Sequence, residues 1–165
     1  MLRKSYVAAL SMLLLGLVAA APDAKNLLKP TNQPSSWRSE LHDAAKADMK
    51  PDGDAISIDI KETDGTDWHV QAIQTNLDLA DGKEYVLTFK AKASAARSVP
   101  VQAAIDQEDW HNIGLEETAE VTDDWKDFKY EFKAQNTAKN KNRIGFILGS
   151  EKGKVWIKDA VLAEK

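Results

Sequence analysis

An alternation of apolar and polar residues with a period of two dominates this chain from residue 55 onward. It is clearest at Ile56, Ile58 and Ile60, which alternate with Ser57 and Asp59. The same pattern recurs in four later stretches, at 85–93, 99–105, 128–132 and 155–161. Because successive side chains of a strand point to opposite faces, such alternation indicates strands with one face in a core and the other in solvent.

Turn-forming segments separate these stretches, and no long helical pattern interrupts them. A glycine with a neighbouring aspartate or lysine occurs at 51–54, 64–67, 81–83 and 152–154. Many short strands separated by such turns are typical of antiparallel sandwiches. We therefore predict an all-β fold, an antiparallel β-sandwich of the jelly-roll type with about nine to eleven strands. A weak pattern at 40–49 leaves the start of a helix open as an alternative in that segment.

The first residues have the organisation of a secretory signal peptide. Arg3 and Lys4 precede a nearly continuous apolar run at 7–21, and the small residues at 18–20 suit signal peptidase. The run is shorter than the roughly 20 residues that a membrane-spanning helix needs. We expect residues 1–20 to be a signal peptide, 21–35 a lead-in segment and 26–165 one β-sandwich domain, secreted or periplasmic. Cleavage after residue 21 and an uncleaved N-terminal anchor are the alternatives.

Composition excludes several classes of function. The chain contains no cysteine, which rules out disulfides, thiolate metal ligands and cysteine nucleophiles. Its formal net charge of −4 becomes −6 once Arg3 and Lys4 are removed. An acidic surface disfavours nucleic acid and anionic lipid. We expect a monomer that has no nucleic-acid partner and, after signal cleavage, no membrane partner.

No motif of catalytic chemistry stands out. The sequence has no Gly-x-Ser-x-Gly and no glycine-rich phosphate loop, and His42, His69 and His111 lack metal-ligand spacing. Acidic pairs such as Glu116-Glu117 resemble the two carboxylates of a glycosidase, but neighbours on a strand point to opposite faces. We predict no enzymatic activity and no metal site. Hydrolase or lyase chemistry by such acids remains a minor alternative.

Five tryptophans in so short a chain are more informative. We expect Trp125 to lie in the core, Trp156 to lie wholly or partly in the core, and Trp37 to pack against the domain. Trp68 and Trp110 instead have polar neighbours on both sides. An indole face stacks well on the C–H face of a sugar ring, so Trp110 is either such a platform or a ring lying flat on its own domain.

Planar polar side chains that suit sugar hydroxyls occur near these two tryptophans and on the neighbouring predicted strands. They are His69, Gln71, Gln74, Arg97, Gln102 and Asp106. Each of them alone is typical of a solvent-facing strand. Together with Trp68 and Trp110, they predict a carbohydrate site on the polar face of one sheet.

The order and spacing of these motifs match a known family over about residues 26–162. The matching segments are Trp68-His69-Val70-Gln71, 79–82, 85–93, Arg97, 121–125, 128–132, 146–149 and 153–162. In this order they resemble the CenC-type carbohydrate-binding domains, which are carbohydrate-binding modules of families four and nine with relatives in family twenty-two. The resemblance implies a galactose-binding-domain-like jelly roll with a glycan groove on its concave sheet.

The resemblance also implies a ligand and a partner. Family members bind soluble or amorphous β-glucans, xylans and related polysaccharides, and they usually accompany secreted glycoside hydrolases. The positions that carry over to the groove are Trp68, Gln71, Gln74 and Arg97. Trp110 falls where the family often has an aromatic residue, and the match at Trp125 carries a packing role only.

Three departures from the family pattern matter. The Phe-Glu pair that often follows the opening Asn-x-x-x-Asn-Gly is missing after Asn26. The family's Ile-Asp-Asp, whose carboxylates help to hold a structural calcium in relatives, is replaced here by Ile157-Lys158-Asp159. Because Lys158 brings a positive charge, we predict no cofactor, and a structural calcium is the alternative. We expect no attached catalytic domain, so that the partner hydrolase is a separate chain, or the domain is a structural or protein-interaction module of the cell envelope.

Overall fold

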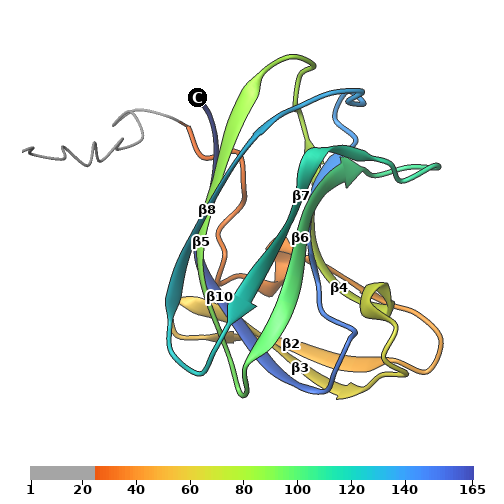
Figure 1. Cartoon of the computed structure of the whole chain (residues 1–165), viewed down its shortest axis with the longest axis vertical. Helices are drawn as coiled ribbons and strands as arrows, with labels where there is room; N and C mark the ends of the chain where they lie inside the picture. The colour runs from red at the N-terminus through yellow and green to blue at the C-terminus, as the bar shows by residue number, and fades with distance from the viewer. Residues whose placement is uncertain (1–24) are drawn as a thin grey trace, which may run out of the picture.

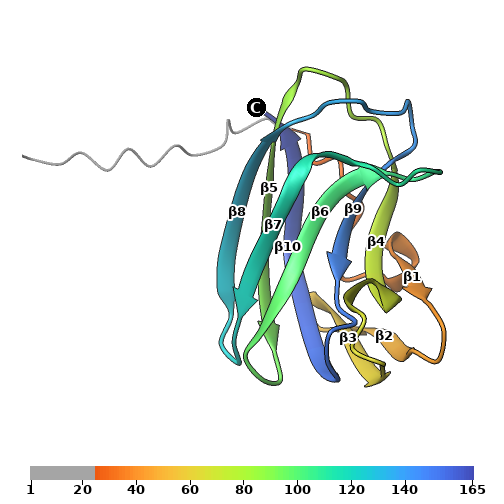
Figure 2. The same cartoon turned by 45° about the vertical axis from the view of Figure 1, so that its right-hand side comes forward.

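The computed structural model describes residues 25–165, which form two five-stranded antiparallel sheets packed face to face (Figures 1 and 2). The strands are β1 (Arg38–Leu41), β2 (Lys46–Asp52), β3 (Ala55–Glu62), β4 (Val70–Leu77), β5 (Glu84–Ala93), β6 (Arg97–Ile105), β7 (Asn112–Val121), β8 (Lys126–Lys133), β9 (Asn142–Ile147) and β10 (Gly153–Glu164). Two short 3-10 helices, η1 (Pro34–Ser36) and η2 (Asp67–His69), interrupt them. The predicted all-β sandwich is confirmed, and its strand number lies within the predicted range.

The strand order separates the chain into two layers. The first sheet has the order β1-β4-β9-β6-β7, and the second sheet has the order β2-β3-β10-β5-β8. Every pairing is antiparallel, and most neighbours are distant in sequence. Strands divided between two sheets in this way form a sandwich, in which each sheet buries one face against the other.

The period-two pattern faces the core as expected. In β5, Tyr85, Leu87 and Phe89 are buried and the residues between them are not. Phe89 meets Phe146 of the opposite sheet edge to face, with ring centroids 4.9 Å apart. Contacts of this kind across the two inner faces close the core.

The alternative of a helix starting at 40–49 is wrong, because this segment forms strands β1 and β2 with a turn between them. β1 pairs with β4, and β2 pairs with β3. Asp43 turns the chain with φ at +52°. Burial alternates in both strands, and Pro51, which lacks an N–H, lies on an edge strand where that donor is dispensable. Where the local sequence pattern is weak, pairing with neighbouring strands therefore determines the secondary structure of the segment.

The tryptophans expected to pack behave differently from one another. Trp37 is buried, donates from Nε1 to the carbonyl of Thr31 at 2.8 Å and contacts Phe146. The expectation that Trp125 belongs to the core is wrong. It is half-buried outside the second sheet, where lysine side chains cover its ring. Trp156 is also half-buried on that outer face.

The lead-in segment is joined to the end of the chain. Leu27 N–H donates to Leu162 O at 2.8 Å, and Asn26 Oδ1 accepts from Leu162 N–H at 3.0 Å. Residues 26–28 are thereby held against β10. The predicted signal peptide at 1–20 lies outside the described residues. Within residues 25–165, no helix has the length and apolar character needed to cross a membrane.

Candidate functional site

A hollow of about 410 Å³ opens on the outward face of the first sheet. It is lined by Glu40, His42, Trp68, Gln71, Gln102, Trp110 and Arg143. The face is set by alternation along β9, where Ile144 and Phe146 enter the core and Arg143 therefore points outward. Glu40, Gln71 and Gln102 occupy outward positions on β1, β4 and β6, which are neighbours of one another or of β9.

Trp68 and Trp110 are two of the three large hydrophobic residues exposed in the described part of the chain, at 49% and 52% of their surface. Trp68 lies in η2, and its ring packs edge to face on His69 at 4.2 Å and on His42 at 5.0 Å. Both indoles line the hollow, so apolar ring surface is available to a ligand there.

Trp110 lies between β6 and β7. Its backbone has φ at +64°, and its N–H donates to Gln107 O at 2.8 Å. The guanidinium of Arg143 lies 5.5 Å from the centroid of its ring, within the range of a cation–π contact. A turn and a cation therefore hold this indole in place.

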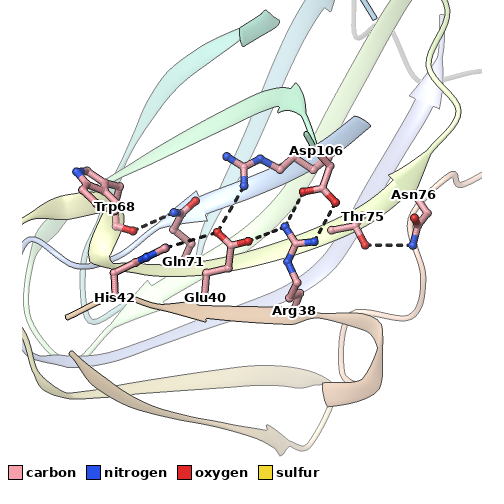
Figure 3. A network of polar contacts seen from close by, with 9 residues as sticks. Arg38, Glu40, His42, Trp68, Gln71, Thr75, Asn76 and Asp106 are labelled. Atoms are coloured by element: carbon pink, nitrogen blue, oxygen red, sulfur yellow. Dashed lines mark hydrogen bonds and ion pairs between the residues drawn. The ribbon is translucent and has the colours of Figure 1, made fainter. Parts of the chain in front are cut away.

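A network of charged groups forms the floor (Figure 3). Arg38 donates from Nη1 and Nη2 to the two carboxylate oxygens of Asp106, at 2.9 and 2.5 Å. It also pairs with Glu40 at 2.6 Å, and the hydrogen bond to Asp106 raises the pKa of Arg38 above its ordinary value. Glu40 Oε2 in turn lies 3.6 Å from Arg143 Nη1. Two carboxylates thus balance two guanidiniums, and the floor has no excess charge.

Some polar atoms of the hollow have no partner within the described residues. Arg143 is only 6% exposed, its Nε has no hydrogen-bond partner there, and burial lowers the pKa of its guanidinium. Gln71 donates from Nε2 to Trp68 O at 2.9 Å, but its buried Oε1 accepts nothing. Buried polar atoms are normally paired, so these two groups offer a donor set and an acceptor to a ligand.

The structure brings four predicted site residues together in the hollow, namely Trp68, Gln71, Gln102 and Trp110. Two others support it from behind. His69 is buried under Trp68, with Nε2 3.3 Å from Asp43 and Nδ1 3.1 Å from Asp64. Asp106 is held by Arg38 and does not line the hollow.

Gln74 and Arg97 lie outside the hollow. Gln74 is 1% exposed and bonds the backbone of Lys29 in both directions, at 2.8 and 3.2 Å. Arg97 donates to the carbonyls of Leu148 and Glu151 at 3.1 and 2.6 Å, and burial lowers its pKa. Both side chains hold the chain's own loops, and a ligand role for them stays a prediction that this geometry does not favour.

Sequence reasoning missed Glu40, His42 and Arg143. Glu40 and His42 belong to the segment whose pattern was weak. Arg143 carried a usable signal, because it is a charged residue directly before the apolar run Ile144-Gly145-Phe146-Ile147 of the same strand. A charge in such a strand must find a partner or a function.

Asp43, Asp64 and His69 are also the one cluster of potential metal ligands among residues 25–165. The two carboxylates approach different nitrogens of the imidazole. Because these nitrogens point away from each other, an ion bound to one of them would leave the carboxylate at the other nitrogen in a separate contact. The contacts of Asp43 and Asp64 with the imidazole are better explained as close charge contacts that flank His69 beneath Trp68.

A jelly-roll sandwich whose outward sheet face carries exposed indoles above a polar floor defines a carbohydrate-binding module. A family model described as "Carbohydrate binding domain", of carbohydrate-binding module families 4 and 9, matches residues 31–152, and the chain belongs to this family. The predicted CenC-type resemblance is confirmed. The family is non-catalytic, so the protein is a binding module rather than an enzyme.

Solved structures agree with this fold. One described as "CBM4 structure and function" is 24% identical, with a TM-score of 0.73, over 84% of this chain and 93% of its own. The second N-terminal cellulose-binding domain of Cellulomonas fimi β-1,4-glucanase C is 18% identical, with a TM-score of 0.68, over 89% and 99%. The N-terminal cellulose-binding domain of the same enzyme is 14% identical, with a TM-score of 0.64, over 81% and 91%. No curated protein matches the chain.

Proposed function

We propose that the hollow on the first sheet binds an uncharged polysaccharide of the β-glucan or xylan type. The observation that carries this proposal is the pair of exposed indoles, Trp68 and Trp110, at one hollow. Leaving two tryptophan rings in water is unfavourable unless a ligand covers them. Sugar rings suit them because their faces are apolar.

The floor supplies the complementary polar contacts. Arg143 and the amide of Gln102 donate to hydroxyl oxygens, and Gln71 Oε1 accepts from a hydroxyl. Because the charges of Arg38, Arg143, Glu40 and Asp106 are balanced within the floor, a neutral chain binds without bringing an unpaired charge into the hollow. The family to which the chain belongs supports carbohydrate as the ligand class.

The proposal includes a setting for this binding. The protein acts as a secreted or periplasmic monomer that brings a separate glycoside hydrolase to its substrate. The signal-peptide pattern at 1–20 supports secretion. The usual association of CenC-type domains with secreted glycoside hydrolases supports the partner.

Affinity gel electrophoresis against β-glucan, xylan, mannan and galactan tests the proposed ligand. We expect one polymer class to retard the protein, and Trp68→Ala and Trp110→Ala to abolish most of the retardation. Trp125→Ala, which removes a half-exposed indole from the opposite sheet, is the matched control and should be retarded like the wild type. Equal retardation of all four proteins would refute the assigned site. No retardation by any polymer would favour the protein-interaction alternative.

A further inference from the structure

A second set of aromatic and cationic side chains lies on the outer face of the second sheet. Lysine ammoniums alternate with tryptophan rings along a row that we call the lysine–tryptophan ladder. Its members in order are Lys158, Trp125, Lys92, Trp156 and Lys154. The distances from each ammonium to the neighbouring ring centroid are 4.7, 5.2, 5.0 and 5.5 Å along the row. All four lie within the range of cation–π attraction.

Sheet register builds the ladder. Lys154, Trp156 and Lys158 are the outward residues of β10, where Val155 and Ile157 enter the core. Lys92 of β5 is directly opposite Trp156. The indole of Trp156 is fixed further, because its Nε1 donates to Asp52 at 2.8 Å. The cations are therefore held by packing on rings, and ordering them for a ligand costs little side-chain entropy.

The charges along the ladder are unequally paired. Lys158 Nζ lies 2.9 Å from Asp54, and Lys154 Nζ lies 3.9 Å from Asp59. Lys92, the central cation, has no carboxylate within ion-pair distance in the described part of the chain. Its ammonium is thus positioned but uncompensated.

A neighbouring lysine, Lys90, is paired only loosely. Lys90 is directly opposite Lys158 across β5 and β10, and like charges in that position repel. The carboxylates nearest to Lys90 Nζ, those of Asp159 and Asp127, are 3.6 and 3.8 Å away, beyond hydrogen-bond distance. A hollow of about 350 Å³ lies beside it, lined in part by Lys90, Asp127, Lys129 and Asp159. Lys90 and Lys92 are both outward residues of β5, so an anion beside them would pair with Lys92 and offset the repulsion between Lys90 and Lys158.

We propose that the ladder and Lys90 form a second binding surface, for a polysaccharide that bears carboxylates, such as a chain of uronic acids. The ammoniums of Lys92 and Lys90 pair with carboxylates, while the exposed parts of Trp125 and Trp156 contact sugar rings. An extended chain fits an open sheet face.

The surface complements the hollow of the first sheet. The two sites lie on opposite layers of the sandwich, and they differ in charge, because the hollow floor is balanced whereas Lys92 of the ladder has no carboxylate partner among the described residues. One domain can therefore bind a neutral polysaccharide and an acidic polysaccharide at the same time. Such linkage raises the effective concentration of each polymer at the other site.

Polygalacturonate, with its fully methyl-esterified form as the uncharged counterpart, tests the proposal in affinity gels and in titrations at low and high salt. We expect the wild type to bind the acid form, and Lys90→Gln/Lys92→Gln to bind it about tenfold more weakly. Lys61→Gln removes a lysine from the same face that is already paired with Asp59, and it is the matched control. It should change affinity by less than about threefold. Salt should weaken the binding, and the esterified polymer should be retained poorly.

The outcomes separate this surface from the hollow. Trp68→Ala should leave polygalacturonate binding unchanged, and Lys90→Gln/Lys92→Gln should leave binding of the neutral polymer unchanged. Loss of polygalacturonate binding in Trp68→Ala would overturn the proposal, because it would place the acidic chain in the hollow. No binding of polygalacturonate, equal binding of the esterified form or an unaffected double variant would overturn it as well.

Discussion

The guanidinium of Arg143 lies 5.5 Å from the ring centroid of Trp110, so a buried cation on strand β9 supports an exposed indole on a distant loop. The same guanidinium reaches Glu40 on β1 at 3.6 Å. Arg143 thus links the wall of the hollow to its floor. Because it contacts both the indole and Glu40, Arg143 is the residue whose replacement tests both parts of the site.

Replacement of Arg143 by glutamine should weaken polysaccharide binding about tenfold, which corresponds to about 1.4 kcal/mol. The variant loses donors to the ligand and the support of Trp110. Arg143→Lys keeps the charge but lacks the planar guanidinium with its several donors. Its affinity should therefore fall between those of the wild type and Arg143→Gln. Titration calorimetry with the retained polymer measures both, and thermal unfolding checks that they fold. Wild-type affinity in Arg143→Gln would exclude a role for this side chain in the hollow.

Gly149 should be essential for the position of Trp68. Its N–H donates to Asp67 O at 2.7 Å, and a Cβ at this residue would collide with the carbonyls of Thr66 and Asp67 in the turn that carries Trp68. We expect Gly149→Ala to destabilise the fold by about 2 kcal/mol and to weaken polymer binding. Urea unfolding and affinity gels measure the two effects.

Gly82→Ala is the control for this prediction. Gly82 has φ at +78° but open space around its Cβ position, so alanine there should cost about 1 kcal/mol through backbone strain alone. Its affinity for the polymer should be unchanged. If Gly149→Ala and Gly82→Ala bound the polymer equally well, the close approach of Gly149 to the Thr66–Asp67 turn would not be what positions Trp68.

His111 should make the Trp110 loop sensitive to pH. Its Nε2 contacts Asn136 O at 2.8 Å and its Nδ1 contacts Asp109 at 2.5 Å, and these bonds, the first being the stronger influence, raise the pKa of His111. Only the protonated ring donates to both acceptors. The stabilisation is therefore complete below the ordinary histidine pKa of about 6.5 and is lost as pH rises through the raised value.

We expect the stability advantage of the wild type over His111→Gln to be largest near pH 5 and to shrink above neutrality. Proton NMR titration of the imidazole gives its pKa, and urea unfolding at several pH values gives the stability difference. A pKa at or below that of a free histidine, or a difference that does not change with pH, would contradict this interpretation.

Removal of metal ions should leave the protein unchanged. Where relatives hold calcium with carboxylates, Lys158 places an ammonium 2.9 Å from Asp54. Treatment with EDTA should shift neither the melting temperature nor the retardation by polymer. A fall in melting temperature that calcium restores and magnesium does not would reveal a calcium site and refute the prediction.

Local sequence was sufficient for the class of fold. Alternation at Tyr85, Leu87 and Phe89 reflects the geometry of a single strand, so it is readable without knowing what the strand packs against. Trp68 and Trp110 could also be predicted as exposed rings from local sequence, because their immediate neighbours are polar. Where the alternation was weak, at 40–49, the sequence did not distinguish a helix start from the strands β1 and β2.

Only tertiary structure decided which polar residues share the hollow. Glu40, Gln71, Gln102 and Arg143 come from strands that are far apart in sequence but adjacent in the first sheet, and pairing across the sheet brings them together. Gln74 and Gln71 look alike in the sequence, yet one bonds the lead-in segment and the other lines the hollow. A residue's own strand determines its face, whereas its partners depend on strand order, which arises from long-range contacts that no local pattern encodes.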